Sequence, residues 1–149
     1  MFKFLLYNKK IIMYIFITFL ILFFFIKLSP KDINNFTNLM SGILTLSSIA
    51  VAFSFSCFSL IPTVADTKIW EQLKKRNTDV KIAKRLLSTI LIFLVTVILS
   101  ILILVLFIKD SNSLISVVFI SLLFSFLFSG ILELFSIVRV IILAVETRD

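Results

Sequence analysis

The stretch LISVVFISLLFSFLFSGIL, Leu114 to Leu132, contains no charged residue. It is close to the roughly 20 residues that a helix needs to cross a bilayer. Three earlier apolar runs are of comparable length, so the sequence predicts four spans at about residues 11–28, 39–65, 86–108 and 113–133. In lipid every backbone polar group must be bonded internally, which favours helices for all four runs. The expected fold is an all-α integral membrane protein, a four-transmembrane-helix bundle.

The composition points the same way, because 60% of the residues are hydrophobic, 18 are Phe and the mean hydropathy is +1.19. These values exceed those of an ordinary soluble domain. The longest hydrophilic segment, residues 66–85, is too short for a core of its own, since independent domains need about 40 residues or more. We therefore expect one membrane domain over residues 1–149. The lone Cys57 offers neither an internal disulfide nor a multi-cysteine metal site.

The first run resembles a signal peptide in one respect, because Lys3, Lys9 and Lys10 precede it. The run ends in FIKLSP, residues 25–30, without the small-x-small site that signal peptidase needs. We expect an uncleaved anchor helix.

Basic residues alternate between the two sides of the predicted membrane. Three precede the first run, seven lie between Lys68 and Arg85 and two lie near the C-terminus, against two around Pro30 and one at Lys109. The positive-inside rule then places both termini and the middle connection in the cytoplasm. The sequence predicts a multi-pass membrane protein whose net charge of +7 attracts anionic lipids of the inner leaflet, with no direct nucleic-acid contact expected.

The cytoplasmic segment 66–85 has an amphipathic pattern, with Ile69, Trp70 and Leu73 on one helical face and mainly basic residues around it. This predicts a short helix on the inner leaflet between spans two and three. The third helix should begin near Val80 and the fourth should continue into the cytoplasm over residues 134–149, packing on the third or on another subunit. The candidate contacts with headgroups or a protein partner are Trp70, Lys74, Lys75, Arg76, Lys84, Arg85 and Arg139.

Small polar residues form stripes along the later spans, whereas span one is rich in Phe and is expected to face lipid. In span four the stripe recurs every four residues, beside Gly130, and places its members on one helical face. It comprises Ser121, Ser125, Ser129 and Glu133. Span two carries Ser41, Thr45, Ser48, Ala52, Ser56, Ser59 and Thr63, and span three a shorter set, Thr89, Thr96 and Ser100.

Two interpretations of the stripes remain open. Small residues let transmembrane helices approach closely, and their hydroxyls bond across helices or to their own backbone. Alternatively, stripes from several subunits line a narrow hydrated path, with the span-four stripe and Ser48, Ala52, Ser56 and Ser59 as candidate lining. Both hold if one stripe packs within the subunit and the other faces a neighbour.

Glu133 is the acidic residue of span four, and counting from Ser113 places it near the inner boundary of the membrane. A carboxylate at that depth is costly unless it is compensated. We expect it to pair with Lys84 or Arg85 at the inner end of the third helix. The alternative is an inner ring of charge at a cation pathway.

The sequence predicts a non-enzymatic protein without a cofactor. It contains no His, no glycine-rich phosphate loop, no paired intramembrane carboxylates and no Ser or Cys with a candidate base. These are the groups on which hydrolase, metalloenzyme and nucleotidase chemistry depends.

The stretches Asn38 to Phe53, Ser59 to Trp70 and Leu73 to Arg76 resemble small four-span proteins of bacterial anti-phage defence systems, such as the Kiwa membrane subunit. The resemblance implies an oligomeric inner-membrane component that senses membrane perturbation and signals to or recruits a cytoplasmic protein. Two alternatives stand beside it, an oligomeric pore that depolarises the membrane and a passive anchor or assembly subunit.

Overall fold

The structure is a computed structural model that describes residues 9–64, 78–107 and 113–146. The described residues are helical apart from short connections, and no β-strand occurs among them. The helices are α2 (Lys9–Ile21), the π-helical turn η1 (Leu22–Ile26), the 3-10 turn η2 (Pro30–Asp32), α3 (Phe36–Val64), α5 (Thr78–Leu106) and α6 (Leu114–Glu146).

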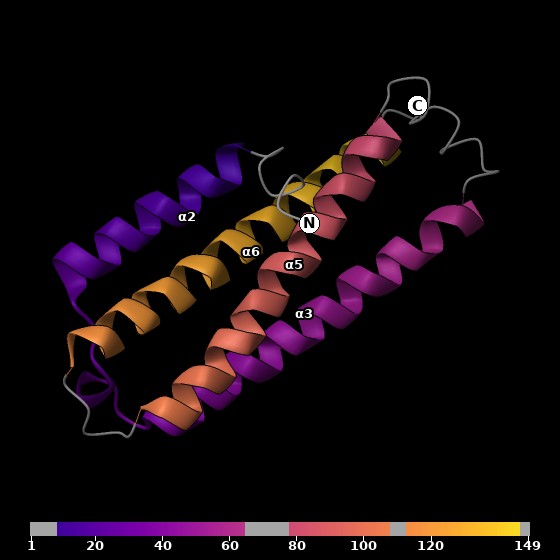
Figure 1. The fold of residues 1–149 in the computed structure, drawn as a ribbon. Coiled ribbons are helices and arrows are strands. Elements are labelled where there is room, and N and C mark those ends of the chain that lie inside the picture. Colours follow the sequence, from indigo (N-terminus) through magenta and orange to yellow (C-terminus); the bar gives the residue numbers. More distant parts are fainter. Residues whose placement is uncertain (1–8, 65–77, 108–112, 147–149) are drawn as a thin grey trace.

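The helices follow a different order in space from their order in the chain (Figure 1). Helix α2 packs on α6, α6 packs on α5, and α5 makes the most extensive contact of all with α3. Helix α5 runs antiparallel to both α3 and α6. Among the described residues α2 and α3 therefore occupy the two edges of an open row, and α5 and α6 form its centre.

Three helices are long and apolar enough to cross a membrane, over Phe36–Ser59, Val80–Leu106 and Leu114–Arg139. The helix at Lys10–Ile26 is apolar but shorter. The all-helical, membrane-like character predicted from the sequence is thus confirmed for the last three runs. Helices α5 and α6 contain 29 and 33 residues. At 1.5 Å per residue both exceed a hydrocarbon core of about 30 Å, as expected for helices that extend beyond the membrane.

The buried residues of α3 and of α5 follow a heptad spacing. Alternating steps of three and four residues keep one stripe of a helix against its neighbour, as in left-handed helix pairs. The α5 stripe is buried throughout and comprises Ile82, Leu86, Thr89, Phe93, Thr96, Ser100 and Ile103. The α3 stripe is buried or half-buried and comprises Phe36, Met40, Ile43, Ser47, Ala50, Ser54 and Cys57.

A second, smaller core joins the extensions of α5 and α6. Ile82 and Leu86 of α5 cluster with Ile137 of α6, and Cys57 packs against them. The expectation that the fourth helix packs on the third beyond the predicted span is therefore confirmed at Ile137. Phe135 and Val138 on the same helix stay exposed, at 69% and 44%.

The connection between α2 and α3 is a compact turn. Lys27 adopts a left-handed conformation, with φ of 48°, and its N–H donates to the Leu22 carbonyl at 2.9 Å. The hydroxyl and the amide of Ser29 then donate to the Asp32 carboxylate, at 2.6 and 3.0 Å. These two bonds, the hydroxyl first, hold the pKa of Asp32 below its ordinary value. The ionised Asp32 carboxylate therefore stabilises the turn at pH values above its unfolded pKa of about 3.9. This stabilisation is lost as the pH falls through the lower pKa of the folded state.

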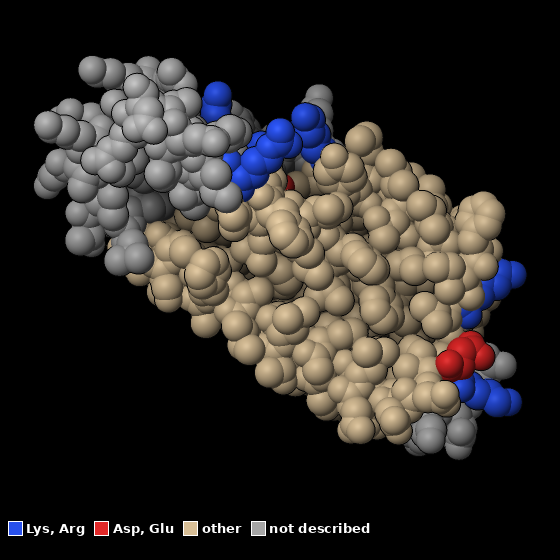
Figure 2. All heavy atoms as spheres, turned by 180° about the vertical axis from the view of Figure 1, so that it is seen from behind, with Lys and Arg blue, Asp and Glu red and all other residues tan. Residues whose placement is uncertain are grey.

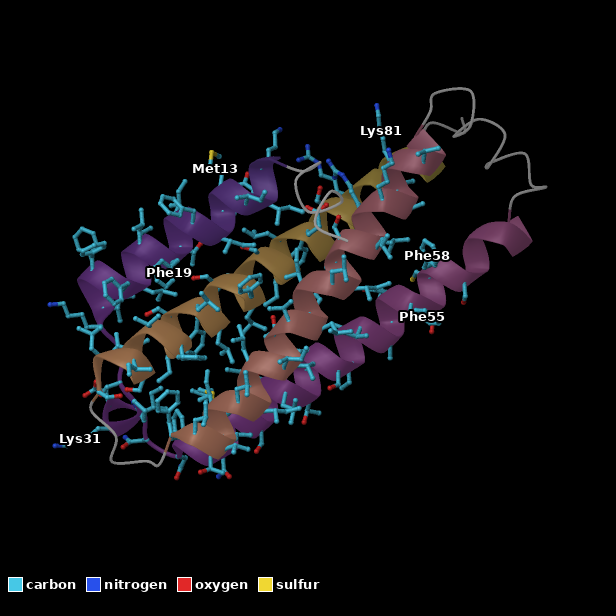
Figure 3. The ribbon with its side chains drawn as sticks, viewed as in Figure 1. Met13, Phe19, Lys31, Phe55, Phe58 and Lys81 are labelled. Atoms are coloured by element: carbon cyan, nitrogen blue, oxygen red, sulfur yellow. The ribbon has the colours of Figure 1, made fainter. Side chains whose placement is uncertain are left out.

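Charged side chains gather at the two ends of an apolar body (Figure 2). Lys31 and Lys81 mark these opposite ends (Figure 3). One end joins the start of α2, the start of α5 and the last part of α6, and its described charged side chains are Lys10, Lys81, Lys84, Arg85, Arg139 and Glu133. We call it the basic end. The other end carries Lys27, Lys31 and Asp32. An apolar belt between two charged ends is the distribution that a bilayer requires.

Gly130 is a position of tight packing between α6 and α5. A Cβ at this glycine would lie 2.9 Å from Cζ of the Phe93 ring, closer than real Cβ contacts. We predict that Gly130→Ala lowers the free energy of unfolding by about 1 to 3 kcal/mol, the usual cost of overpacking. Thermal unfolding in lipid nanodiscs measures this cost.

Gly42 on α3 provides the matched control, because a Cβ there meets nothing within 4 Å. Gly42→Ala should be neutral or stabilising, since alanine favours helix. Phe93→Leu should restore part of the stability lost in Gly130→Ala. Equal melting behaviour of the two alanine variants would show that the α5–α6 contact at Phe93 is wrong.

Candidate functional site

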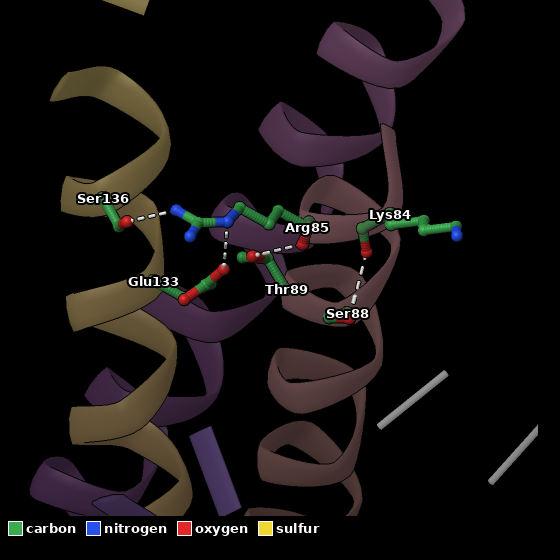
Figure 4. Close-up of polar contacts among 6 residues, drawn as sticks. All are labelled: Lys84, Arg85, Ser88, Thr89, Glu133 and Ser136. Carbon is green, nitrogen blue, oxygen red and sulfur yellow. Dashed lines mark hydrogen bonds and ion pairs between the residues drawn. The ribbon is translucent and has the colours of Figure 1, made fainter. Parts of the chain in front are cut away.

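A charged cluster crosses between α5 and α6 at the basic end (Figure 4). Arg85 of α5 reaches to α6, where its Nε lies 3.7 Å from Oε1 of Glu133. Its Nη1 donates to the Ser136 hydroxyl at 2.5 Å. Of the two partners predicted for Glu133, the structure brings Arg85 to it, whereas Lys84 points away (Figure 4).

The local sequence explains this geometry. Glu133 and Ser136 are three residues apart on α6, so both side chains face the same neighbour. Arg85 immediately precedes Leu86 of the buried α5 stripe and lies on its α6 side. A guanidinium presents several N–H donors in a fixed plane, which suits a carboxylate and a hydroxyl together.

The Arg85–Glu133 ion pair links α5 to α6 at a position where the carboxylate is buried. Glu133 is 8% exposed, and its carboxylate needs a compensating charge at such a position. The Arg85 side chain is 35% exposed, so the guanidinium also reaches the surface. The pair ties the extension of α6 to the first turns of α5 and leaves a cation at the boundary of the apolar belt.

The serine stripe of α6 is covered within the protomer. Ser121, Ser125 and Ser129 are at most 2% exposed. They lie on the opposite side of α6 from Ile120, Leu123 and Leu127, which belong to the core shared with α3 and α5. Helix α2 is the other element packed on α6, so it covers the stripe. Small residues here allow the two backbones to approach closely.

The stripe of α3, unlike that of α6, is exposed. Its members Ser41, Thr45, Ser48, Ala52, Ser56 and Ser59 are all exposed, and the side chain of Thr63 lies outside the described residues. The hydroxyls of Thr45, Ser48 and Ser59 donate to carbonyls of their own helix, at 2.8 to 2.9 Å. These polar atoms therefore need no partner in lipid, and a second helix could cover them without breaking a bond. We call this surface the outer face of α3.

Sequence reasoning missed the polar residues on the inner side of α3. Ser47 and Ser54 are 0% exposed and belong to the stripe that packs on α5. Their hydroxyls have no hydrogen-bond partner among the described residues, and the same holds for Ser100, Ser121 and Ser129. The heptad spacing from Phe36 was the signal that could have located them, because it marks the buried side of α3.

The remaining candidates are partly outside the described residues. Trp70, Lys74, Lys75 and Arg76 lie there, as does most of the predicted inner-leaflet helix. Arg139 is exposed on α6, six residues beyond Glu133.

Comparison with family models, curated proteins and solved structures finds no significant match. The resemblance to anti-phage defence proteins therefore stays a prediction from the sequence. The functional argument rests on the Arg85–Glu133 cluster and on the outer face of α3.

The Arg85–Glu133 pair should contribute to stability. Arg85→Ala removes the cation beside a buried carboxylate, which costs about 3 to 5 kcal/mol in a fully buried pair. Because Arg85 is partly exposed, we expect a smaller loss of about 1 to 2 kcal/mol, measured by unfolding in nanodiscs.

The exposed Lys81 supplies the control, and Lys81→Ala should change stability by less than about 0.5 kcal/mol. The double variant Arg85→Met, Glu133→Leu should regain most of the loss, since an apolar pair leaves no buried charge. If the Arg85→Ala variant has the same free energy of unfolding as the parent protein, the ion pair does not stabilise the contact between α5 and α6.

Proposed function

We propose that this chain is a non-enzymatic, oligomeric component of the bacterial inner membrane. It senses perturbation of the membrane and signals to or recruits a cytoplasmic partner, and it does so in anti-phage defence. The observation that carries the oligomeric part of this proposal is the exposed outer face of α3. The resemblance of Asn38 to Phe53 and the segments after it to defence proteins supplies the biological context.

The proposed topology has four spans with both termini in the cytoplasm. Three helices meet the length of a span, and we take the shorter helix at Lys10–Ile26 as the fourth. It is supported by the course of α2, which lies against α6 and starts at the same end as α5 (Figure 1). The basic end has five described basic side chains and the other end has two. The positive-inside rule then favours the basic end as cytoplasmic.

Oligomerisation through the outer face of α3 is supported by three properties. The helix stands at an edge of the row, so one side of it is open to a neighbour. Its outer face consists of small residues, which allow close approach of a second helix. No charged residue occurs between Phe36 and Val64, so two copies of α3 can meet without repulsion.

Differences in helix length support a role in sensing. The shorter helix at Lys10–Ile26 packs on α6, whose candidate span is 26 residues long. Helices of unequal length respond differently to a change in bilayer thickness, because each adjusts its tilt to match the hydrocarbon core. A tilt of α6 would be transmitted to the basic end through the Arg85–Glu133 pair.

A pore is the second candidate function, and the burial of the α6 stripe limits which residues could line it. The stripe of α6 is covered by α2, so a pore between subunits would be lined by Ser48, Ala52, Ser56 and Ser59 of α3. A passive anchor or assembly subunit would use the same contact without conduction.

Leucine on the outer face of α3 should separate the subunits. We expect Ser48→Leu combined with Ser56→Leu to shift the protein toward a monomer, because bulk prevents close helix approach. Photobleaching steps or cross-linking in nanodiscs report the number of copies. Phe53→Leu, at an exposed position of the same helix, is the matched control.

The membrane potential of cells that express the parent protein or the leucine variant distinguishes the pore from the sensor and the anchor. Depolarisation by the parent protein that is lost in the leucine variant supports the pore, and unchanged potential supports the sensor or the anchor. A parent protein that is monomeric in nanodiscs contradicts the oligomeric proposal.

The basic segment beyond α3 should recruit the partner. We expect Lys74→Ala, Lys75→Ala and Arg76→Ala together to abolish co-purification of a soluble protein with this chain from native membranes. The reason is that charge complementarity governs such encounters. Lys27→Ala with Lys31→Ala removes charge from the opposite end and should have no effect. Retention of the soluble protein by the triple variant would exclude this segment as the docking site.

A further inference from the structure

One side of α6 is left uncovered near the ion pair with α5. Phe128, Leu132 and Phe135 are 49%, 50% and 69% exposed, and Arg139 is exposed as well. These residues follow one another at steps of four, three and four, which places all of them on the same side of a helix. We call this surface the exposed face of α6. It is apolar up to Arg139, where it becomes cationic.

The change from apolar to cationic occurs where the candidate span of α6 ends. This span runs over Leu114–Arg139, and Arg139 is the first charged residue on the exposed face. Headgroups of a bilayer begin beyond the hydrocarbon core, and arginine is favoured at that level. The exposed face thus presents apolar side chains at the depth of acyl chains and a guanidinium at the depth of phosphates.

Arg85 brings a second guanidinium to the same place from α5. Its Nη1 donates to the Ser136 hydroxyl at 2.5 Å. Ser136 precedes Arg139 by three residues, and residues at this spacing on a helix are neighbours, with about 5 to 6 Å between their Cβ atoms. Both arginines are therefore neighbours of Ser136.

This group of side chains keeps hydrogen-bond donors for a ligand. Among the described residues, Arg85 uses Nε toward Glu133 and Nη1 toward Ser136, and its Nη2 has no partner. The Ser136 hydroxyl accepts the bond from Arg85, so its own proton is available to donate. The Arg85 side chain is 35% exposed, whereas Glu133 is buried. Figure 2 shows Lys and Arg side chains gathered at this end with little acidic surface among them.

A phospholipid with a negative net charge matches both parts of this surface. Guanidinium groups bind phosphate oxygens through parallel N–H bonds, and a hydroxyl adds a further donor. A free phosphate would leave the apolar residues without a ligand. A zwitterionic lipid carries a cation next to its phosphate, and two arginines repel it. An anionic lipid carries no such cation, and its acyl chains can lie against the apolar residues.

We propose that α6 binds one anionic phospholipid, with the phosphate between Arg85, Ser136 and Arg139 and an acyl chain along Phe128, Leu132 and Phe135. This inference rests on the proposed membrane location, with the basic end at a bilayer surface. It does not depend on oligomerisation or on a cytoplasmic partner.

Native mass spectrometry of the full chain tests the headgroup contact. The protein is released from nanodiscs that contain equal amounts of phosphatidylglycerol and phosphatidylcholine with the same acyl chains. We expect one retained phosphatidylglycerol per chain. Arg139→Gln should lower this retention about tenfold, since it removes a charged hydrogen-bond donor at an exposed position.

Lys81→Gln is the matched control, because it removes the same charge from an exposed residue of the basic end that lies on α5. It should leave the retention unchanged. Equal retention of the two lipids by the parent protein would overturn the proposal. An equal loss in both variants would also overturn it, because binding would then follow total charge and not this site.

Photoreactive acyl chains locate the bound lipid in the parent protein, so this measurement does not depend on the folding of a variant. Phe53 and Phe55 of α3 are 57% and 62% exposed on a helix without charged residues, and they serve as the reference surface. We expect phosphatidylglycerol, relative to phosphatidylcholine, to label the exposed face of α6 in excess and α3 equally. Equal excess on both helices would contradict the site. A second copy or a soluble protein on this face would prevent labelling by either lipid, and that result would contradict it too.

The same mass spectra separate this inference from the proposed function, because they count the chains in each complex. A monomer that retains phosphatidylglycerol contradicts only the oligomeric proposal. An oligomer without a preference between the lipids contradicts only the lipid site.

Discussion

Each polar atom within the spans needs a partner inside the protein, because lipid has none to offer. This constraint accounts for most of the side-chain geometry. The hydroxyls of Thr45, Ser48 and Ser59 donate hydrogen bonds to carbonyls of their own helix. The α3 surface that carries them can therefore face lipid or a second helix. Glu133 obtains a guanidinium from the neighbouring helix. Five buried serine hydroxyls have neither solution among the described residues, those of Ser47, Ser54, Ser100, Ser121 and Ser129.

The central position of α5 and α6 follows from where small residues allow close contact. Gly130 leaves room for the Phe93 ring between α5 and α6. Serines on the other side of α6 leave room for α2, and the inner serines of α3 allow this helix to pack against α5. Each contact uses small residues on a different side of a helix. The outer face of α3 has the same composition and no neighbour in the protomer, and this is the physical basis for proposing a second copy there.

The proposed functions draw on different parts of this arrangement. Sensing relies on the unequal lengths of helices that are fastened to one another, and the Arg85–Glu133 pair links their movement to the basic end. A pore would rely on the outer face of α3 instead. The covered stripe of α6 serves neither as a lining between subunits nor as a docking surface in this fold, because α2 lies over it.

Residue order alone predicted the helices, because runs of apolar residues long enough to span lipid have one stable conformation there. It also predicted the continuation of α6 beyond Leu132 and the two cations that could meet Glu133. It could not choose between Arg85 and Lys84, since that depends on how α5 is rotated about its axis. For the same reason the stripes of α3 and α6 looked equivalent, although one is exposed and the other buried. Spacing shows that residues share a face of a helix, but only the packing of α2 on α6 and of α3 on α5 decided which faces are covered.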